Sequence, residues 1–204
     1  LVLKIKINMT ITELYTQLEN KDFQDHHTGN LFFPAYMYMY DAQKEYEIDK
    51  EILDIKNRLH RPNNYLDVMV IDLFEIFCAY LKQEKFGKSN KYDFYTANEL
   101  NKPEAVDKAL EKDAYDTRFL NYLDAKIKEH LENAKTYEVA YVFLKGFGNA
   151  FPYIRASRFM NNFEKYINGY KLIMFYPGEA KNYYSLFGLL KDENLYRAIK
   201  LINA

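Results

Sequence analysis

Four short apolar runs, separated by segments with helical periodicity, constrain the fold of this chain most strongly. The runs are Ala35–Tyr40, Leu66–Leu73, Val139–Leu144 and Lys171–Tyr176. Continuous apolar runs of this length are typical of strands that are covered on both faces, as in a parallel sheet. Parallel neighbours need crossover connections, which are usually helices. The pattern therefore predicts one α/β domain with about four mostly parallel strands between two layers of helices, in a Rossmann-like three-layer arrangement.

Apolar residues recur at helical spacing between these runs, which places helices in the connections. Thr10 and Glu13 have the Thr-x-x-Glu spacing of a capping box, and the helix that they begin is expected to end near Glu19. Pro152 and Gly169 stand where helices have a first-turn proline and a terminating glycine. The other expected helices are Tyr46–Arg61, Phe74–Leu81, Pro103–Lys112, Thr117–Lys135 and Pro152–Ile167.

The domain organisation follows from what separates these elements. No linker rich in Pro, Gly or Ser divides the chain, so residues 1–204 are expected to form one domain. Residues 83–102 are polar and include Gly87, which predicts a mobile connection. Residues 1–8 are expected either to form a short strand or to be sequence upstream of a natural start at Met9. Two closing elements are expected at Tyr183–Leu190 and Asn194–Ile202.

Charge and composition exclude several broad classes of protein. Hydrophobic residues are 49% and charged residues 28%, which excludes a wholly disordered chain. The net charge of −1 creates no overall field that would attract nucleic acid or an anionic membrane. No apolar run reaches the length of about 18 residues that a membrane span needs. Cys78, the single cysteine, excludes an internal disulfide framework and fits a reducing cytoplasm.

The segment after the third strand is the strongest candidate for ligand binding. Gly146 and Gly148 precede a helix that carries Arg155 and Arg158. The N-terminus of a helix can hold an anion, and ligands of open α/β sheets gather at the carboxyl ends of strands. The planar guanidinium of arginine can donate hydrogen bonds to a phosphate or a carboxylate. The alternative, which we favour, is a structural turn that lets helix and sheet pack.

A second candidate lies just past the fourth strand. Pro177 and Gly178 predict a turn there, and Glu179 follows them. In a parallel sheet this segment would stand beside the first loop, where Glu179 could act as an acid or base or pair with an arginine. A solvated surface glutamate is the alternative. The full candidate set for anion or ligand binding is Gly146, Gly148, Asn149, Arg155, Arg158 and Glu179.

The patterns of established nucleotide sites are incomplete. The Gly146-x-Gly148 segment has Phe151 where a dinucleotide fingerprint has its third glycine. The Gly87-Lys88-Ser89 segment has Lys82 where a P-loop has its first glycine. Neither segment therefore predicts a bound nucleotide cofactor.

Metal and nucleophile patterns are incomplete as well. His26 and His27 lie near Asp22 and Asp25 but lack the spacing of zinc ligands, so no metal is expected. Cys78 lies on the apolar face of its helix and is interpreted as a core residue. No Gly-x-Ser-x-Gly elbow is present, and no catalytic set is complete.

Several segments resemble the BrxB family. The clearest are Val142-Phe143-Leu144-x-Gly146-x-Gly148-x-x-x-Pro152-x-x-Arg155 with Asn161-Asn162, Met174-Phe175-Tyr176-Pro177-Gly178-Glu179, Leu186-Phe187-Gly188 and Asn194-x-Tyr196-Arg197-Ala198. Weaker ones are Gly29-Asn30, Phe33-Pro34, Tyr40-Asp41 and Val70-Ile71-Asp72-Leu73. The resemblance runs from Gly29 to Ile199 and is thin between Lys82 and Glu138. The chain departs from the family at Ser157, where a histidine is common.

The resemblance implies a component of a BREX phage-defence system, with no assigned catalysis and no cofactor. It implies assembly with other BREX proteins, above all a PglZ-like subunit with a phosphatase fold, in the cytoplasm, with nucleic-acid contact at most indirect. The residues alone leave an alternative open. This is a nucleotide- or phosphate-sensing module that uses the Gly146–Gly148 loop and Arg155. A weaker idea is direct contact with DNA through Lys85–Lys91 and Arg155–Arg158.

Overall fold

The computed structural model describes residues 9–24, 35–134, 137, 140–180, 183–186, 190–194 and 200–201, with the backbone alone from residue 179 on. The expectations for residues 1–8 and for His26 and His27 lie outside the described residues.

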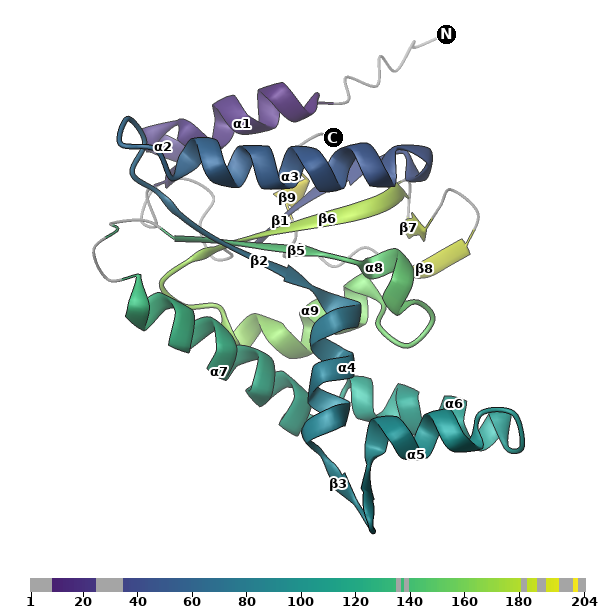
Figure 1. The fold of residues 1–204 in the computed structure, drawn as a ribbon. Coiled ribbons are helices and arrows are strands. Elements are labelled where there is room, and N and C mark those ends of the chain that lie inside the picture. The colour runs from purple at the N-terminus through teal and green to yellow at the C-terminus, as the bar shows by residue number, and fades with distance from the viewer. Residues whose placement is uncertain are drawn as a thin grey trace, which may run out of the picture.

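Parallel strands form the centre of the molecule, as predicted (Figure 1). The strands are β1 (Ala35–Tyr40), β2 (Asp67–Asp72), β5 (Ala140–Lys145) and β6 (Lys171–Ala180), in the spatial order β2-β5-β6-β1. All three pairings among them are parallel, with Ile71 opposite Leu144 and Leu144 opposite Met174. The short strand β9 (Lys200–Leu201) extends the sheet beside β1. The strands β7 (Tyr183–Leu186) and β8 (Leu190–Asn194) continue antiparallel from the end of β6.

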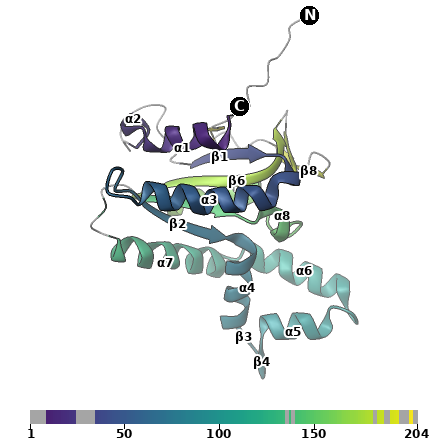
Figure 2. The ribbon, with the colours of Figure 1, turned by 45° about the horizontal axis from the view of Figure 1, so that its top comes forward.

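Helices cover both faces of this sheet, so the domain has the three layers that the sequence predicts (Figures 1 and 2). One face carries α1 (Ile11–Glu19), α2 (Lys21–Gln24) and α3 (Glu45–Leu59). The other face carries α4 (Leu73–Gln83), α7 (Thr117–Asn133), α8 (Phe147–Ala150) and α9 (Ala156–Phe163). Helices α5 (Lys91–Asn98) and α6 (Pro103–Ala114) project from that second layer, and single 3-10 turns lie at Ala42–Lys44 and Glu164–Tyr166.

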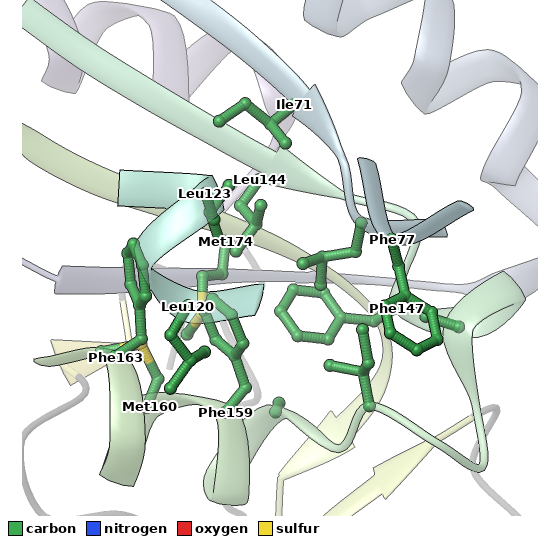
Figure 3. Close-up of a cluster of buried hydrophobic side chains, with 14 of the residues drawn as sticks. Ile71, Phe77, Leu120, Leu123, Leu144, Phe147, Phe159, Met160, Phe163 and Met174 are labelled. Carbon is green, nitrogen blue, oxygen red and sulfur yellow. The ribbon is translucent and has the colours of Figure 1, made fainter. Parts of the chain in front are cut away.

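Two cores result because successive side chains of a strand point to opposite faces. In β5, Tyr141 and Phe143 pack against α1 and α3, whereas Val142 and Leu144 pack against the other layer. Figure 3 shows the second core, in which side chains of α7, α8 and α9 gather around Leu144 and Met174. A strand that is apolar at every position is therefore buried on both sides, which is what the continuous runs predicted.

Side-chain caps set the starts of several helices. Thr10 and Glu13 form the predicted capping box, with both reciprocal hydrogen bonds present. Asn90, Asp72 and Asp116 accept hydrogen bonds from backbone N–H groups at the starts of α5, α4 and α7.

Residues 83–102, for which the sequence predicts a mobile connection, contain a hairpin and a helix. The strands β3 (Lys85–Phe86) and β4 (Ser89–Asn90) make an antiparallel hairpin that turns at Gly87, where φ is +62°. Helix α5 follows directly. The sequence is polar because most of this segment faces solvent, not because it lacks secondary structure.

The predicted helix start at Pro152 and the predicted turn at Pro177-Gly178 are both wrong. Pro152 does not begin a helix: it lies in a turn, and α9 begins at Ala156 after α8 and a bend at 151–154. The reason is that Phe147 and Ala150 are buried on the short helix α8, and Ile154 is buried in the bend that follows it. Pro177-Gly178 is not a turn either, because β6 continues through both residues to pair with β1 and then β7.

Candidate functional site

Polar side chains gather where the parallel strands end. Tyr40, Asp72 and Lys145 are the last residues of β1, β2 and β5, so the parallel sheet brings them to one edge. Glu45 and Asp49, from the first turns of α3, lie against the same edge. This is where open α/β sheets place their ligands, and we name these five residues the edge cluster.

Lys145 links two carboxylates of the edge cluster. Its Nζ lies 2.9 Å from Asp49 Oδ1 and 3.4 Å from Asp72 Oδ2. Burial acts to lower the pKa of Lys145, but the hydrogen bonds and charges of the two aspartates outweigh it and raise that pKa. Lys145 is therefore a firmly charged cation, and it is not prepared to act as a nucleophilic amine.

Asp72 belongs to the edge cluster and also caps the helix α4 that follows β2. Its Oδ1 accepts hydrogen bonds from the N–H groups of Phe74 (2.9 Å) and Glu75 (3.1 Å). The same carboxylate lies against Gly146, so a Cβ placed on Gly146 would be 2.6 Å from Asp72 Oδ1. Gly146 also has a left-handed φ of +83°. Two constraints, close approach and backbone conformation, therefore demand glycine here.

Tyr40 and Glu45 form the second half of the cluster. The Tyr40 hydroxyl donates to Glu45 Oε2 over 2.7 Å. Burial and the neighbouring carboxylates raise the pKa of Tyr40 far above its ordinary value. Burial also raises the pKa of Glu45, aided by the charges of Asp49 and Asp72, although the Tyr40 bond and Lys145 oppose this shift.

The hydrogen bonds and ion pairs of the edge cluster hold several strands and helices together. Its three carboxylates and one ammonium tie β1 and α3 to the ends of β2 and β5. No group of His, Cys, Asp and Glu side chains in the described parts of the chain has the arrangement of a metal site. An anion beside Gly146 would meet the Asp72 carboxylate, which repels it.

The residues predicted for anion binding fall into separate surroundings. Gly146 is buried beside Asp72, Gly148 is a half-buried residue of α8, and Asn149 is exposed. Arg155 stands before α9, where its N–H donates to the Tyr115 hydroxyl over 2.8 Å. Its guanidinium lies over the ring of Phe151, 5.7 Å from the centroid.

Arg158 and Glu179 complete the predicted set. Arg158 bonds Glu111 Oε1 over 2.8 Å and lies over the ring of Tyr115, 3.9 Å from its centroid. The backbone of Glu179 lies opposite Ser185 in the antiparallel pairing of β6 with β7. The two arginines thus contact the aromatic and acidic residues that flank them, while the contact of Gly146 is with Asp72.

Sequence reasoning missed the edge cluster as a site, although one signal for it is present. Each of three buried strands ends on a residue with a polar group, and the strands were expected to be parallel. Glu45 and Asp49 carry no such signal, because acidic residues are ordinary in the first turns of a helix.

Comparison with known proteins assigns the family. The family model described as "BREX protein BrxB" matches residues 69–201. The chain belongs to the BrxB family. A BrxB protein of Bacillus cereus (strain H3081.97), described as "BREX protein BrxB", is 25% identical over 199 residues, covering 97% of this chain and 98% of its own. No solved structure matches the chain.

BrxB membership confirms the resemblance found in the sequence and makes this chain a component of a BREX defence system, with other BREX proteins as its partners. The match includes Asp72, Lys145 and Gly146, whereas Tyr40, Glu45 and Asp49 precede it. Among the described helices, none has both the length and the apolar character needed to cross a bilayer.

Proposed function

We propose that this BrxB protein is a non-catalytic assembly subunit that binds the PglZ-like subunit of its BREX system in the cytoplasm. The match to the BrxB family identifies BREX as the system to which the chain belongs. The observation that carries the non-catalytic role is the edge cluster, in which the charged groups at the ligand-binding edge of the sheet bond to one another.

The pairing within the edge cluster supports this role in a specific way. A general acid or base must reach a substrate proton, yet the Tyr40 hydroxyl donates to Glu45 and Lys145 bonds Asp49 and Asp72. Asp72 also caps α4. The edge therefore fixes the positions of strands and helices, as a scaffold for partners requires.

The half-buried Cys78 is compatible with the cytoplasmic location that we propose. Burial raises the pKa of the Cys78 thiol, which disfavours the reactive thiolate. A single unreactive thiol suits a reducing cytoplasm.

The proposal is tested by mixing the purified chain with the PglZ-like subunit from the same locus. We expect a stable heteromeric complex in size-exclusion chromatography with light scattering, and a titratable affinity at moderate salt. Absence of binding at roughly 50 μM would contradict the proposal, because a specific subunit contact is tighter than that.

The phosphate- or nucleotide-sensing alternative, through Gly146, Gly148 and Arg155, makes a different prediction. A ligand that binds only the folded protein raises its melting temperature. The assembly role predicts no shift with millimolar phosphate or ATP, since Asp72 lies where an anion beside Gly146 would sit. A rise of several degrees that Arg155→Ala abolishes would favour the sensor.

A further inference from the structure

A projecting lobe of the molecule carries exposed aromatic side chains. Helices α5 and α6 and the hairpin β3–β4 extend beyond the sheet, on the side of α4, in both ribbon views (Figures 1 and 2). We name the hairpin with α5, residues 85–98, the aromatic arm. Phe86 on the hairpin is 44% exposed and Phe94 on α5 is 38% exposed. Their ring centroids lie 4.4 Å apart, so the two rings form one apolar knob at the tip of the arm.

The arm is held rigidly beneath this knob. The hairpin is closed by its own pairing and by the Lys91 N–H, which donates to the Glu84 carbonyl over 2.9 Å. Asn90 caps α5 through its contacts with Asp93. Below the tip, the buried Lys91 ammonium lies 2.6 Å from Asp113 Oδ1. An exposed apolar group on such a preordered support loses little conformational entropy when a partner binds it.

The exposed charges around the knob are positive on balance. Lys85 and Lys88 are exposed on the hairpin, and no ion pair or hydrogen bond of their side chains is present among the described residues. Of the acidic neighbours, Glu84 pairs with Arg118 over 2.9 Å. Asp93 is exposed and accepts from the neutral Asn90 amide over 2.8 Å, so it keeps its charge, and the two lysines leave the rim with a net positive charge. The arm thus presents an apolar centre with a cationic rim, although the whole chain has a net charge of −1.

We propose that the aromatic arm is a docking surface whose Phe86–Phe94 knob enters an apolar pocket with an acidic rim on a partner protein. This inference rests on the proposed function, and it assigns the contact with the PglZ-like subunit to one face of this chain. Aromatic anchors that fill apolar pockets dominate the binding energy of protein interfaces. The complementary charges of the two rims orient the encounter.

The composition of the arm favours a protein over a nucleic acid. Phosphate-driven affinity grows with the number of phosphates that cations neutralise. Lys85 and Lys88 would neutralise only about two of them, which is too few for strong binding at physiological salt. In addition, the rings of Phe86 and Phe94 lie against each other, so each ring already uses part of the surface on which a base would stack.

The test compares variants of the full chain in binding to the PglZ-like subunit by biolayer interferometry. Phe86→Ser and Phe94→Ser are each expected to weaken binding by about tenfold or more, through faster dissociation. The double variant Lys85→Glu/Lys88→Glu is expected to slow association about tenfold at low salt, and raising the salt should reduce this difference. Leu100→Ser is the matched control, because Leu100 is 94% exposed on the same lobe but lies outside the arm.

The outcomes distinguish failure of the docking surface from failure of the proposed function. Loss of binding in the arm variants, with unchanged melting temperatures and normal binding by Leu100→Ser, supports the docking surface. Equal binding by all variants overturns the docking surface and leaves the proposed function standing. Absence of binding by the unchanged chain overturns both. Binding of a labelled single-stranded DNA 20-mer that the lysine variant abolishes would assign the arm to nucleic acid instead and overturn the inference.

Discussion

At the residue scale, the contact between Gly146 and Asp72 has the clearest consequences. Gly146 is a candidate for anion binding in the sequence, and in the structure its missing side chain makes room for a carboxylate. Its left-handed φ and the close Asp72 oxygens are separate reasons for glycine. A substitution at this position therefore measures both effects together, and a second glycine can separate them.

We expect Gly146→Ala to lower the free energy of unfolding by about 2–4 kcal/mol, since left-handed backbone costs a non-glycine residue about 1–2 kcal/mol and the clash with Asp72 adds to it. Gly169→Ala is the control, because Gly169 has a φ of +78° but a Cβ added there would meet nothing within 4 Å. It should show only the conformational cost. Equal losses in urea unfolding would contradict the close-approach argument.

Asp116 offers a second prediction at this scale, for the dependence of stability on pH. Hydrogen bonds from Arg118, reduced in effect by burial and joined by the charge of Arg118, lower the pKa of Asp116 from 3.8 to about 2. A lowered folded-state pKa stabilises the protein above the unfolded pKa, and this stabilisation is lost as the pH falls from about 4 to 2.

Asp116→Asn keeps a good helix cap but removes the charge. We expect it to flatten the acid limb of the stability profile between about pH 4 and pH 2, by up to about 1 kcal/mol because Arg118 is largely exposed. Urea midpoints measured across this pH range give the result. An unchanged acid limb would show that the Asp116–Arg118 pair contributes no pH-dependent stability.

At the scale of elements, one buried network fixes α5 against α6. Asp113 accepts from Lys91 over 2.6 Å and from the Tyr95 hydroxyl over 2.7 Å, and all three side chains are buried. Lysine and aspartate are rarely buried unless paired, so this network explains how a polar stretch forms a packed helix. Local sequence did not reveal it, because Lys91 and Asp113 belong to different helices.

Asp113→Ala is expected to destabilise the protein by about 3–5 kcal/mol, because it leaves the Lys91 ammonium buried without a partner. The double variant Lys91→Met/Asp113→Leu should recover most of this loss, since two apolar side chains replace the pair. Chemical denaturation of both variants measures the difference. If the double variant were as unstable as Asp113→Ala, the unpaired charge would not be the cause.

At the scale of the whole molecule, the edge cluster ties together crossover units that are distant in sequence. Asp49 on α3, Asp72 at the end of β2 and Lys145 at the end of β5 meet only because the strands are parallel and adjacent. Removing the central cation leaves the carboxylates facing one another. The cluster should therefore contribute to global stability more than a surface ion pair does.

We expect Lys145→Met to cost about 1–3 kcal/mol in free energy of unfolding, as a partly buried charge pair loses one partner. Lys126→Met is the control: Lys126 is 42% exposed and pairs with Glu129, which is 64% exposed, over 3.0 Å within α7. A change within about 0.5 kcal/mol is expected there. Similar effects in thermal and urea unfolding would mean that the edge cluster is no more than a surface feature.

The sequence by itself determined the layers of this protein and the direction of its strands. Runs such as Ala35–Tyr40 can bury every side chain only between two helical layers, and the capping box at Thr10 is a local signal that needs no distant partner. Local patterns also carried the family resemblance that the comparisons confirm.

Only the tertiary structure decided the rest, because it depends on groups that meet from distant parts of the chain. Pro177 and Gly178 have turn propensity, but pairing with Tyr40 of β1 and Leu186 of β7 keeps them in a strand. Position 146 requires glycine because the carboxylate of Asp72, at the end of β2, lies against it. Local propensities are worth about 1 kcal/mol or less per residue, so the hydrogen bonds and burial that neighbouring strands and helices supply override them.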